Sequence, residues 1–152
     1  KTINDVVFYL QTLKAPIPRA SSIEGKTIME NIGCTKCHVA QFQTATSRVT
    51  ALSQKTIFPY SDLLLHDMGP DLDDGYTEGS ALTSEWRTPP LWGLGLSKNS
   101  QGGKYFLLHD GRAKSIEEAI LLHGGEGQNS KESFESLTAL EKQQLIQFLE
   151  SL

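Results

Sequence analysis

Apolar residues recur at helical spacing in four stretches of the chain. Residues three and four positions apart lie on one face of a helix, so each stretch predicts a helix with one buried side. The sequence predicts these helices near residues 3–13, 21–32, 115–123 and 138–152. Their apolar positions are Ile3, Val6, Val7, Leu10 and Leu13 in the first, Ile23, Ile28, Met29 and Ile32 in the second, Ile116, Ala119 and Ile120 in the third, and Leu145, Phe148, Leu149 and Leu152 in the fourth.

The three later helices also carry signals for their first turn. A Ser or Thr followed three residues later by Glu is typical of a capping box, in which each side chain binds a backbone N–H of the helix end. The pairs are Ser21 with Glu24, Ser115 with Glu118, and Thr138 with Glu141. Glycines at Gly33 and at Gly124 and Gly125 predict where the second and third helices end.

The opening helix has no such start signal, and Pro16 and Pro18 end it. A helix without a start indicates that residues 1–19 are the terminal helix and linker of a preceding domain that is absent from this chain. Residues 20–152 are then long enough to form one domain of their own.

Between residues 39 and 114 neither the helical nor the strand period is sustained. Irregular loops longer than about 15 residues are uncommon in compact domains. A buried prosthetic group could serve as the core on which such loops pack. The sequence therefore predicts an all-α domain with long irregular loops packed around a bound group.

Charge and hydropathy exclude two classes of partner. The formal net charge is -4 and the isoelectric point is about 5.5, so nothing attracts the chain to nucleic acid. No apolar run approaches the ~20 residues that cross a bilayer. We therefore expect no membrane span in this chain.

The two cysteines lie together in Cys34-Thr35-Lys36-Cys37, and His38 follows at once. A structural zinc site needs four ligands, and a thioredoxin-like redox dithiol sits near a βαβ pattern that is missing here. Cys-x-x-Cys-His is instead typical of covalent c-type haem attachment, with the thiols on the vinyl groups and the imidazole on the iron. We expect one haem c held by Cys34, Cys37 and His38, with a redox dithiol as the alternative.

An electron-transfer haem usually has a second axial ligand. His123 is the favoured candidate, because it lies at the glycine-capped end of a helix, on its apolar face, ahead of the last helix. Met68 is the alternative distal ligand, and its thioether would raise the reduction potential relative to a second imidazole. His66 is interpreted as a polar loop residue and His109 as a turn residue or an inner hydrogen-bonding residue near the haem.

Other side chains are candidates for contact with the cofactor. Arg87 and Arg112 could pair with the haem propionates, because a guanidinium fork matches a carboxylate. Pro89 and Trp92 are rigid or flat groups suited to packing on a porphyrin. Surface charge and ordinary core packing remain open as alternative roles for these residues.

Five motifs, taken in order, resemble one protein family. They are Cys34-Thr35-Lys36-Cys37-His38, Tyr60-Ser61-Asp62-Leu63-Leu64-Leu65-His66-Asp67-Met68-Gly69, Glu85-Trp86-Arg87-Thr88-Pro89-Pro90-Leu91-Trp92-Gly93, His109-Asp110-Gly111-Arg112-Ala113, and Glu117-Glu118-Ala119-Ile120 followed by His123-Gly124-Gly125. Together they look like the C-terminal part of the di-haem oxidoreductases described as peroxidases or thiol oxidoreductases. They are more distantly similar to the bacterial di-haem cytochrome c peroxidases.

The resemblance implies a periplasmic protein of two haem domains, each shaped like a class I cytochrome c. In the peroxidase relatives the C-terminal haem transfers electrons and the N-terminal haem meets peroxide. Those relatives carry a methionine distal ligand where His123 stands here, so the resemblance favours a bis-histidine iron in this chain.

The expected function is therefore electron transfer through one covalent haem, as the relay domain of a larger di-haem oxidoreductase. Its expected partners are the second haem domain of the same protein and a redox partner protein. Peroxidase-type chemistry on peroxide, at this haem or the missing one, is the alternative. A haem-based sensor with ligand exchange at Met68 or His123 is a third hypothesis.

Overall fold

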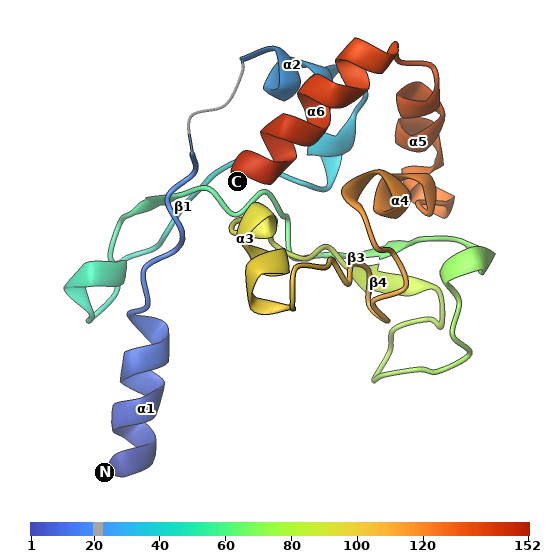
Figure 1. Cartoon of the computed structure of the whole chain (residues 1–152). Helices are drawn as coiled ribbons and strands as arrows, with labels where there is room; N and C mark the ends of the chain where they lie inside the picture. The colour runs from blue at the N-terminus through green and yellow to red at the C-terminus, as the bar shows by residue number, and fades with distance from the viewer. Residues whose placement is uncertain (20–22) are drawn as a thin grey trace.

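The computed structural model describes residues 1–19 and 23–152, and Figure 1 shows the arrangement of its elements. Among the described residues the α-helices are α1 (Thr2–Gln11), α2 (Ile23–Asn31), α3 (Leu94–Ser100), α4 (Ile116–Leu121), α5 (Gln128–Glu135) and α6 (Ala139–Ser151). The strands are β1 (Phe42–Gln43), β2 (Thr56–Ile57), β3 (Leu65–Asp67) and β4 (Glu85–Arg87). Short 3-10 helices occur at η1 (Cys34–Lys36), η2 (Thr50–Leu52), η3 (Pro70–Leu72) and η4 (Gly125–Gly127).

The strands form two small antiparallel sheets, β1 with β2 and β3 with β4. The prediction of an all-α, class I cytochrome c-like domain is therefore wrong: the fold mixes helices, two strand pairs and long loops. In the second sheet Leu65 pairs with Arg87 and Asp67 pairs with Glu85. Strands of two or three residues are too short to show a period of two in the sequence, and a distant partner stabilises them.

The core lies where α2 packs against α6 (Figure 1). Met29 of α2 is buried there with Leu145, Phe148 and Leu149 of α6, which are the apolar positions that the helical spacing predicted. Gly25 permits this approach, because a Cβ at Gly25 would meet the Gln144 carbonyl oxygen and would lie 2.6 Å from the Phe148 Cβ.

Gly25→Ala is accordingly expected to lower the free energy of unfolding by about 1–3 kcal/mol, because the added methyl group overpacks the α2–α6 contact. Urea denaturation of the haem-loaded protein measures the change. Lys26→Ala is the matched control, because Lys26 is exposed on the same helix and makes an exposed ion pair with Glu30. Equal stability of the two variants would contradict the close packing described here.

The structure confirms one of the expected capping boxes in full and another in part. Thr138 and Glu141 form the complete capping box at α6, as predicted. At α4 the Ser115 side chain accepts from the Glu118 N–H, but the Glu118 carboxylate turns to the Lys114 N–H, so only half of that box forms. The predicted start at Ser21 lies outside the described residues.

Two helices, α3 and α5, were not predicted. Neither helix buries a stripe of apolar residues: α5 buries Phe134 and otherwise carries polar residues, and α3 buries Gly95. In α3, a Cβ at Gly95 would collide with the Glu150 carbonyl group. Contact with α6, rather than amphipathic spacing, stabilises α3.

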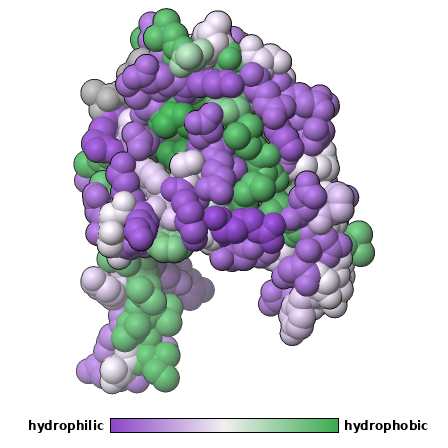
Figure 2. Space-filling view, turned by 45° about the vertical axis from the view of Figure 1, so that its right-hand side comes forward, coloured by the Kyte–Doolittle hydropathy of each residue, from purple (hydrophilic) through white to green (hydrophobic). Residues whose placement is uncertain are grey.

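Helix α1 stands away from the rest of the chain, and none of its residues is buried (Figure 1). Its exposed hydrophobic side chains include Ile3, Phe8 and Leu10. Figure 2 shows hydrophobic surface along the protruding helix. The assignment of residues 1–19 to a preceding domain stays a prediction. Among the described residues, no helix has the length and hydrophobicity that crossing a bilayer requires.

The chain exposes 9849 Å² of surface, more than the about 7,700 Å² typical of a compact protein of its mass. The detached α1 accounts for part of the excess. Large apolar side chains at Leu63, Leu64 and Leu65 are also exposed, next to and within β3. The loops around β3 therefore leave hydrophobic surface without a protein partner among the described residues.

Candidate functional site

The Cys-x-x-Cys-His motif occupies one tight turn that follows α2. Gly33 adopts φ 84°, a left-handed conformation that glycine accommodates, and ends the helix there. Cys34 then begins η1, and the His38 N–H donates to the Cys34 carbonyl at 2.9 Å. The turn thus holds Cys34, Cys37 and His38 within five consecutive residues.

His38 is oriented by a backbone hydrogen bond. Its Nδ1 lies 2.9 Å from the Tyr60 carbonyl oxygen, and a carbonyl only accepts, so Nδ1 carries the proton. Tyr60 has φ 52°, which non-glycine residues seldom adopt, and its ring packs edge-on against Phe148 of α6 at 5.9 Å. In a neutral His38, Nε2 then carries the lone pair, as in a metal-ligating histidine.

Burial keeps this imidazole neutral. It lowers the pKa of His38 to about 4, and His123 contributes to the same direction by charge repulsion. A neutral ring at physiological pH can donate its lone pair to a metal without first losing a proton.

His123, just beyond the end of α4, has the same arrangement. Its Nδ1 lies 2.7 Å from the Ala119 carbonyl oxygen, one turn back in α4, which again leaves Nε2 with the lone pair. Burial lowers the pKa of His123 as well. The charge of Lys131 lowers the pKa of His123 further.

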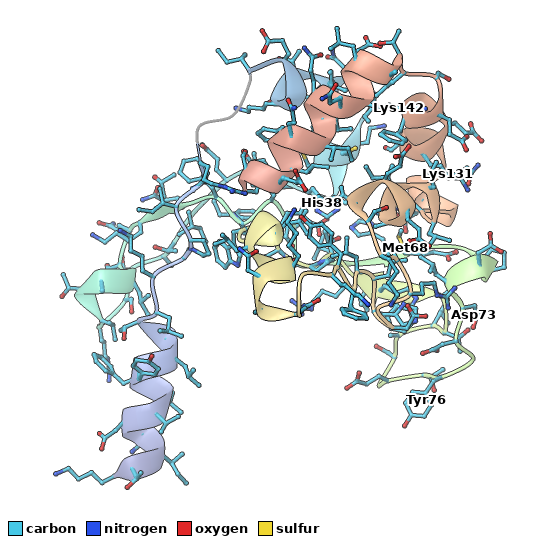
Figure 3. The ribbon with its side chains drawn as sticks, in the orientation of Figure 1. His38, Met68, Asp73, Tyr76, Lys131 and Lys142 are labelled. Carbon is cyan, nitrogen blue, oxygen red and sulfur yellow. The ribbon has the colours of Figure 1, made fainter. Side chains whose placement is uncertain are left out.

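Met68 lies beside His123, on the loop that follows β3. A Cβ added at Gly127 would lie 3.2 Å from the His123 Cβ and 3.5 Å from the Met68 Cε, so both side chains flank this glycine. Figure 3 shows His38 and Met68 toward the middle of the molecule, whereas Asp73 and Tyr76 lie on an outer loop. The favoured and the alternative distal ligand therefore share one region.

The remaining histidines are engaged elsewhere. Both ring nitrogens of His66 are hydrogen-bonded to carboxylates, Nε2 to Asp62 and Nδ1 to Glu126. The exposed ring of His109 stacks on Trp86 with 3.5 Å between centroids and 4° between planes. Of the four histidines in the chain, His38 and His123 have Nδ1 hydrogen-bonded to a backbone carbonyl oxygen.

The two thiols lack the environment of a redox dithiol. They are not joined by a disulfide, and burial raises the pKa of Cys34 to about 11. Burial, together with the charges of Asp62 and Glu126, also raises the pKa of Cys37. A reactive cysteine needs a lowered pKa, because the thiolate is the nucleophile, so this site disfavours the alternative.

The other predicted contact residues are more peripheral. Arg87 and Pro89 are exposed, Arg87 within β4, and Trp92 is half-buried. Arg112 is held by the Asp110 carboxylate at 2.5 Å and by the Asp71 carbonyl oxygen at 2.8 Å. Arg112 is therefore already ordered on a turn, with part of its guanidinium engaged.

The donor set fits the group that the motif implies. Two thiols and two neutral imidazoles with free Nε2 atoms are the ligands of a covalent haem with two axial histidines. Figure 2 shows hydrophobic residues in the middle of one face, surrounded by hydrophilic ones. The half-buried turn, the free lone pairs and the unpartnered apolar loops agree with a large planar group.

Sequence reasoning missed one part of the site, the pairing of His66 with Asp62 and Glu126. Asp62 precedes β3 and Glu126 lies in η4, so no local spacing in the sequence brings both acids to His66. The proximity of Glu126 to His123 in the sequence was the one available signal.

Comparison with known proteins supports both the fold and the family. Among solved structures, the chain is similar to hydrazine synthase of Kuenenia stuttgartiensis, pressurized with xenon, at 17% sequence identity and a TM-score of 0.54. The match covers 95% of this chain and 52% of that chain, so this chain spans about half of its structural relative. No curated protein sequence matches it. The profile of the family described as "Di-haem oxidoreductase, putative peroxidase" matches residues 1–152, and the chain therefore belongs to the di-haem oxidoreductase family.

Proposed function

We propose that the chain binds one haem c through Cys34 and Cys37 and relays single electrons within a larger di-haem oxidoreductase. His38 is the proximal ligand and His123 the distal ligand. The observation that carries the proposal is the matched pair of histidines, each with Nδ1 bound to a backbone carbonyl oxygen and Nε2 free.

When bound, the haem supplies an iron that accepts and releases one electron. The chain's own residues hold the ligands in place before and after that change. Backbone carbonyl groups of Tyr60 and Ala119 fix both imidazole orientations, so neither ring has to rotate or lose a proton. Such fixed ligation favours electron transfer over bond-making chemistry, which needs an open iron position.

Peripheral residues complete the proposed site. Arg87 and Arg112 would pair with the haem propionates, with Arg112 already ordered by Asp110. Pro89 and Trp92 would pack on the porphyrin, and His109, which stacks on Trp86, would lie at the edge of the site. Such contacts would exclude water from the ring.

The proposed partners follow from the family and the motif count. The family is di-haem and this chain carries one Cys-x-x-Cys-His motif, so the second haem domain belongs to the same longer protein. The unburied α1 is the segment available to contact that domain. A redox partner protein supplies or accepts the electron. Covalent haem attachment outside the cytoplasmic membrane supports a periplasmic location.

A second candidate function is peroxidase chemistry. It is supported by the family description and by the closeness of Met68 and His123, because two competing ligands allow one to leave the iron. Peroxide would then react at this haem or at the second one.

Carbon monoxide binding and peroxide turnover distinguish the two functions in the purified haem-loaded chain. The electron-relay proposal predicts a one-electron reductive titration, a low-spin spectrum in both oxidation states, and only slow carbon monoxide binding to the reduced chain. Rapid carbon monoxide binding together with peroxide turnover would replace it with the peroxidase function.

A further inference from the structure

His66 joins two segments that are far apart in the sequence. Its Nε2 lies 2.8 Å from the Asp62 Oδ2, and its Nδ1 lies 2.9 Å from the Glu126 Oε2. Carboxylate oxygens accept, so both ring nitrogens donate and the imidazole carries a proton on each. The His66 and Asp62 side chains are 15% and 10% exposed and the Glu126 side chain is 56% exposed, so water reaches the Glu126 bond more readily than the Asp62 bond. We call Asp62, His66 and Glu126 the His66 clamp.

One end of the clamp fixes the loop that follows His123. Glu126 lies three residues beyond His123, and its Oε1 accepts from the Asp67 N–H at 3.0 Å. The loop passes close to the backbone after β3, since a Cβ at Gly124 would lie 2.8 Å from the Met68 carbonyl oxygen. Glu126 thus binds the segment beyond the distal histidine to the strand that precedes Met68.

The other end of the clamp reaches the haem-attachment turn. The Asp62 N–H donates to the Cys37 carbonyl oxygen at 2.8 Å. A hydrogen-bonded path therefore runs from the Cys37 turn through Asp62, His66 and Glu126 to the His123 loop. This path connects the segments that carry the two candidate axial histidines.

The charges make the clamp sensitive to loss of any member. His66 separates two carboxylates that would otherwise face each other without a cation between them. Removal of the Glu126 carboxylate leaves the loop after His123 without its side-chain bonds to both Asp67 and His66. We expect this loss to loosen the loop more than the loss of one surface ion pair would. The reason is that Glu126 and His66 share three hydrogen bonds, to Asp62, to Asp67 and to each other.

We propose that the His66 clamp positions His123, keeping this histidine on the iron and Met68 off it, and so keeps the distal side closed. This inference rests on the proposed function, since it requires His123 as the distal ligand. Asp62, His66 and Glu126 are positioning residues that act through His123.

The test uses Glu126→Ala in the haem-loaded chain, with carbon monoxide as the probe of the reduced protein. We expect carbon monoxide to bind about 10- to 100-fold faster than in the unaltered chain, as typical for loss of a group that orients a metal ligand. Glu126→Gln retains hydrogen-bonding atoms and is expected to restore slow binding in part. Glu78→Ala is the matched control, because Glu78 is an exposed acid on the outer loop.

Far-UV circular dichroism and retention of covalent haem establish that each variant folds, and His66→Gln serves as a second variant if Glu126→Ala does not. An unchanged low-spin spectrum and unchanged carbon monoxide rate in both folded variants would overturn the clamp. His123→Ala distinguishes failure of the clamp from failure of the proposed distal ligand. If it opens the iron to carbon monoxide while the clamp variants do not, only the clamp fails; if it changes nothing, the proposed ligand fails.

Discussion

The double variant Cys34→Ser, Cys37→Ser is expected to lose covalent haem completely. These are the two cysteines of the chain, so no other thiol can form a thioether bond. His38 and His123 would still present their free Nε2 atoms, and any haem they hold would be reversibly bound. Extraction with acidified acetone measures the difference: the haem leaves the variant and stays with the unaltered chain.

The single variants provide the control for this result. Cys34→Ser and Cys37→Ser should each retain one thioether bond, so part of the haem should resist extraction. Equal, complete extraction from the unaltered chain would contradict attachment at this turn. The raised thiol pKa values would then have to be reconciled with another role for the two cysteines.

His123→Ala is expected to convert the low-spin ferric spectrum to a high-spin or methionine-ligated one. Loss of the distal imidazole leaves an open position that Met68 can reach, because both side chains flank Gly127. If Met68 binds, the reduction potential should rise by a sizeable fraction of the ~0.8 V over which axial ligands set haem potentials. Visible spectroscopy and a redox titration check both changes.

Met68→Leu is the matched control, because leucine fills a similar volume without a sulfur atom. It should leave the spectrum and the potential of the otherwise unaltered chain nearly unchanged. A large change in Met68→Leu with none in His123→Ala would reverse the assignment of the two ligands. The double variant should bind carbon monoxide readily when reduced.

The parts of the fold that follow from local sequence could be predicted. Helix α6 combines an apolar stripe ending in Leu149 with a capping box at Thr138, and both signals lie within its own residues. The β3–β4 sheet could not be predicted, because Leu65 and Arg87 pair across a long loop and each strand has three residues. Short strands depend on contacts that no local period records.

The candidate site divides in the same way. The spacing of Cys34, Cys37 and His38 indicates the attachment turn, and His123 as the distal ligand stays a prediction, since α4 ends at Leu121 before it. The hydrogen bond from His38 to Tyr60 and the His66 clamp depend on tertiary contacts between loops. A motif of adjacent residues could therefore be recognised from the sequence, whereas the residues that orient it through tertiary contacts could not.

The most direct test of the account is the intact mass of the denatured chain after expression with the c-type haem attachment machinery. We expect a polypeptide of 16.8 kDa carrying the added mass of one haem, with the added mass retained after acid-acetone extraction. A mass equal to the polypeptide alone, from a colourless protein that is otherwise folded, would contradict it.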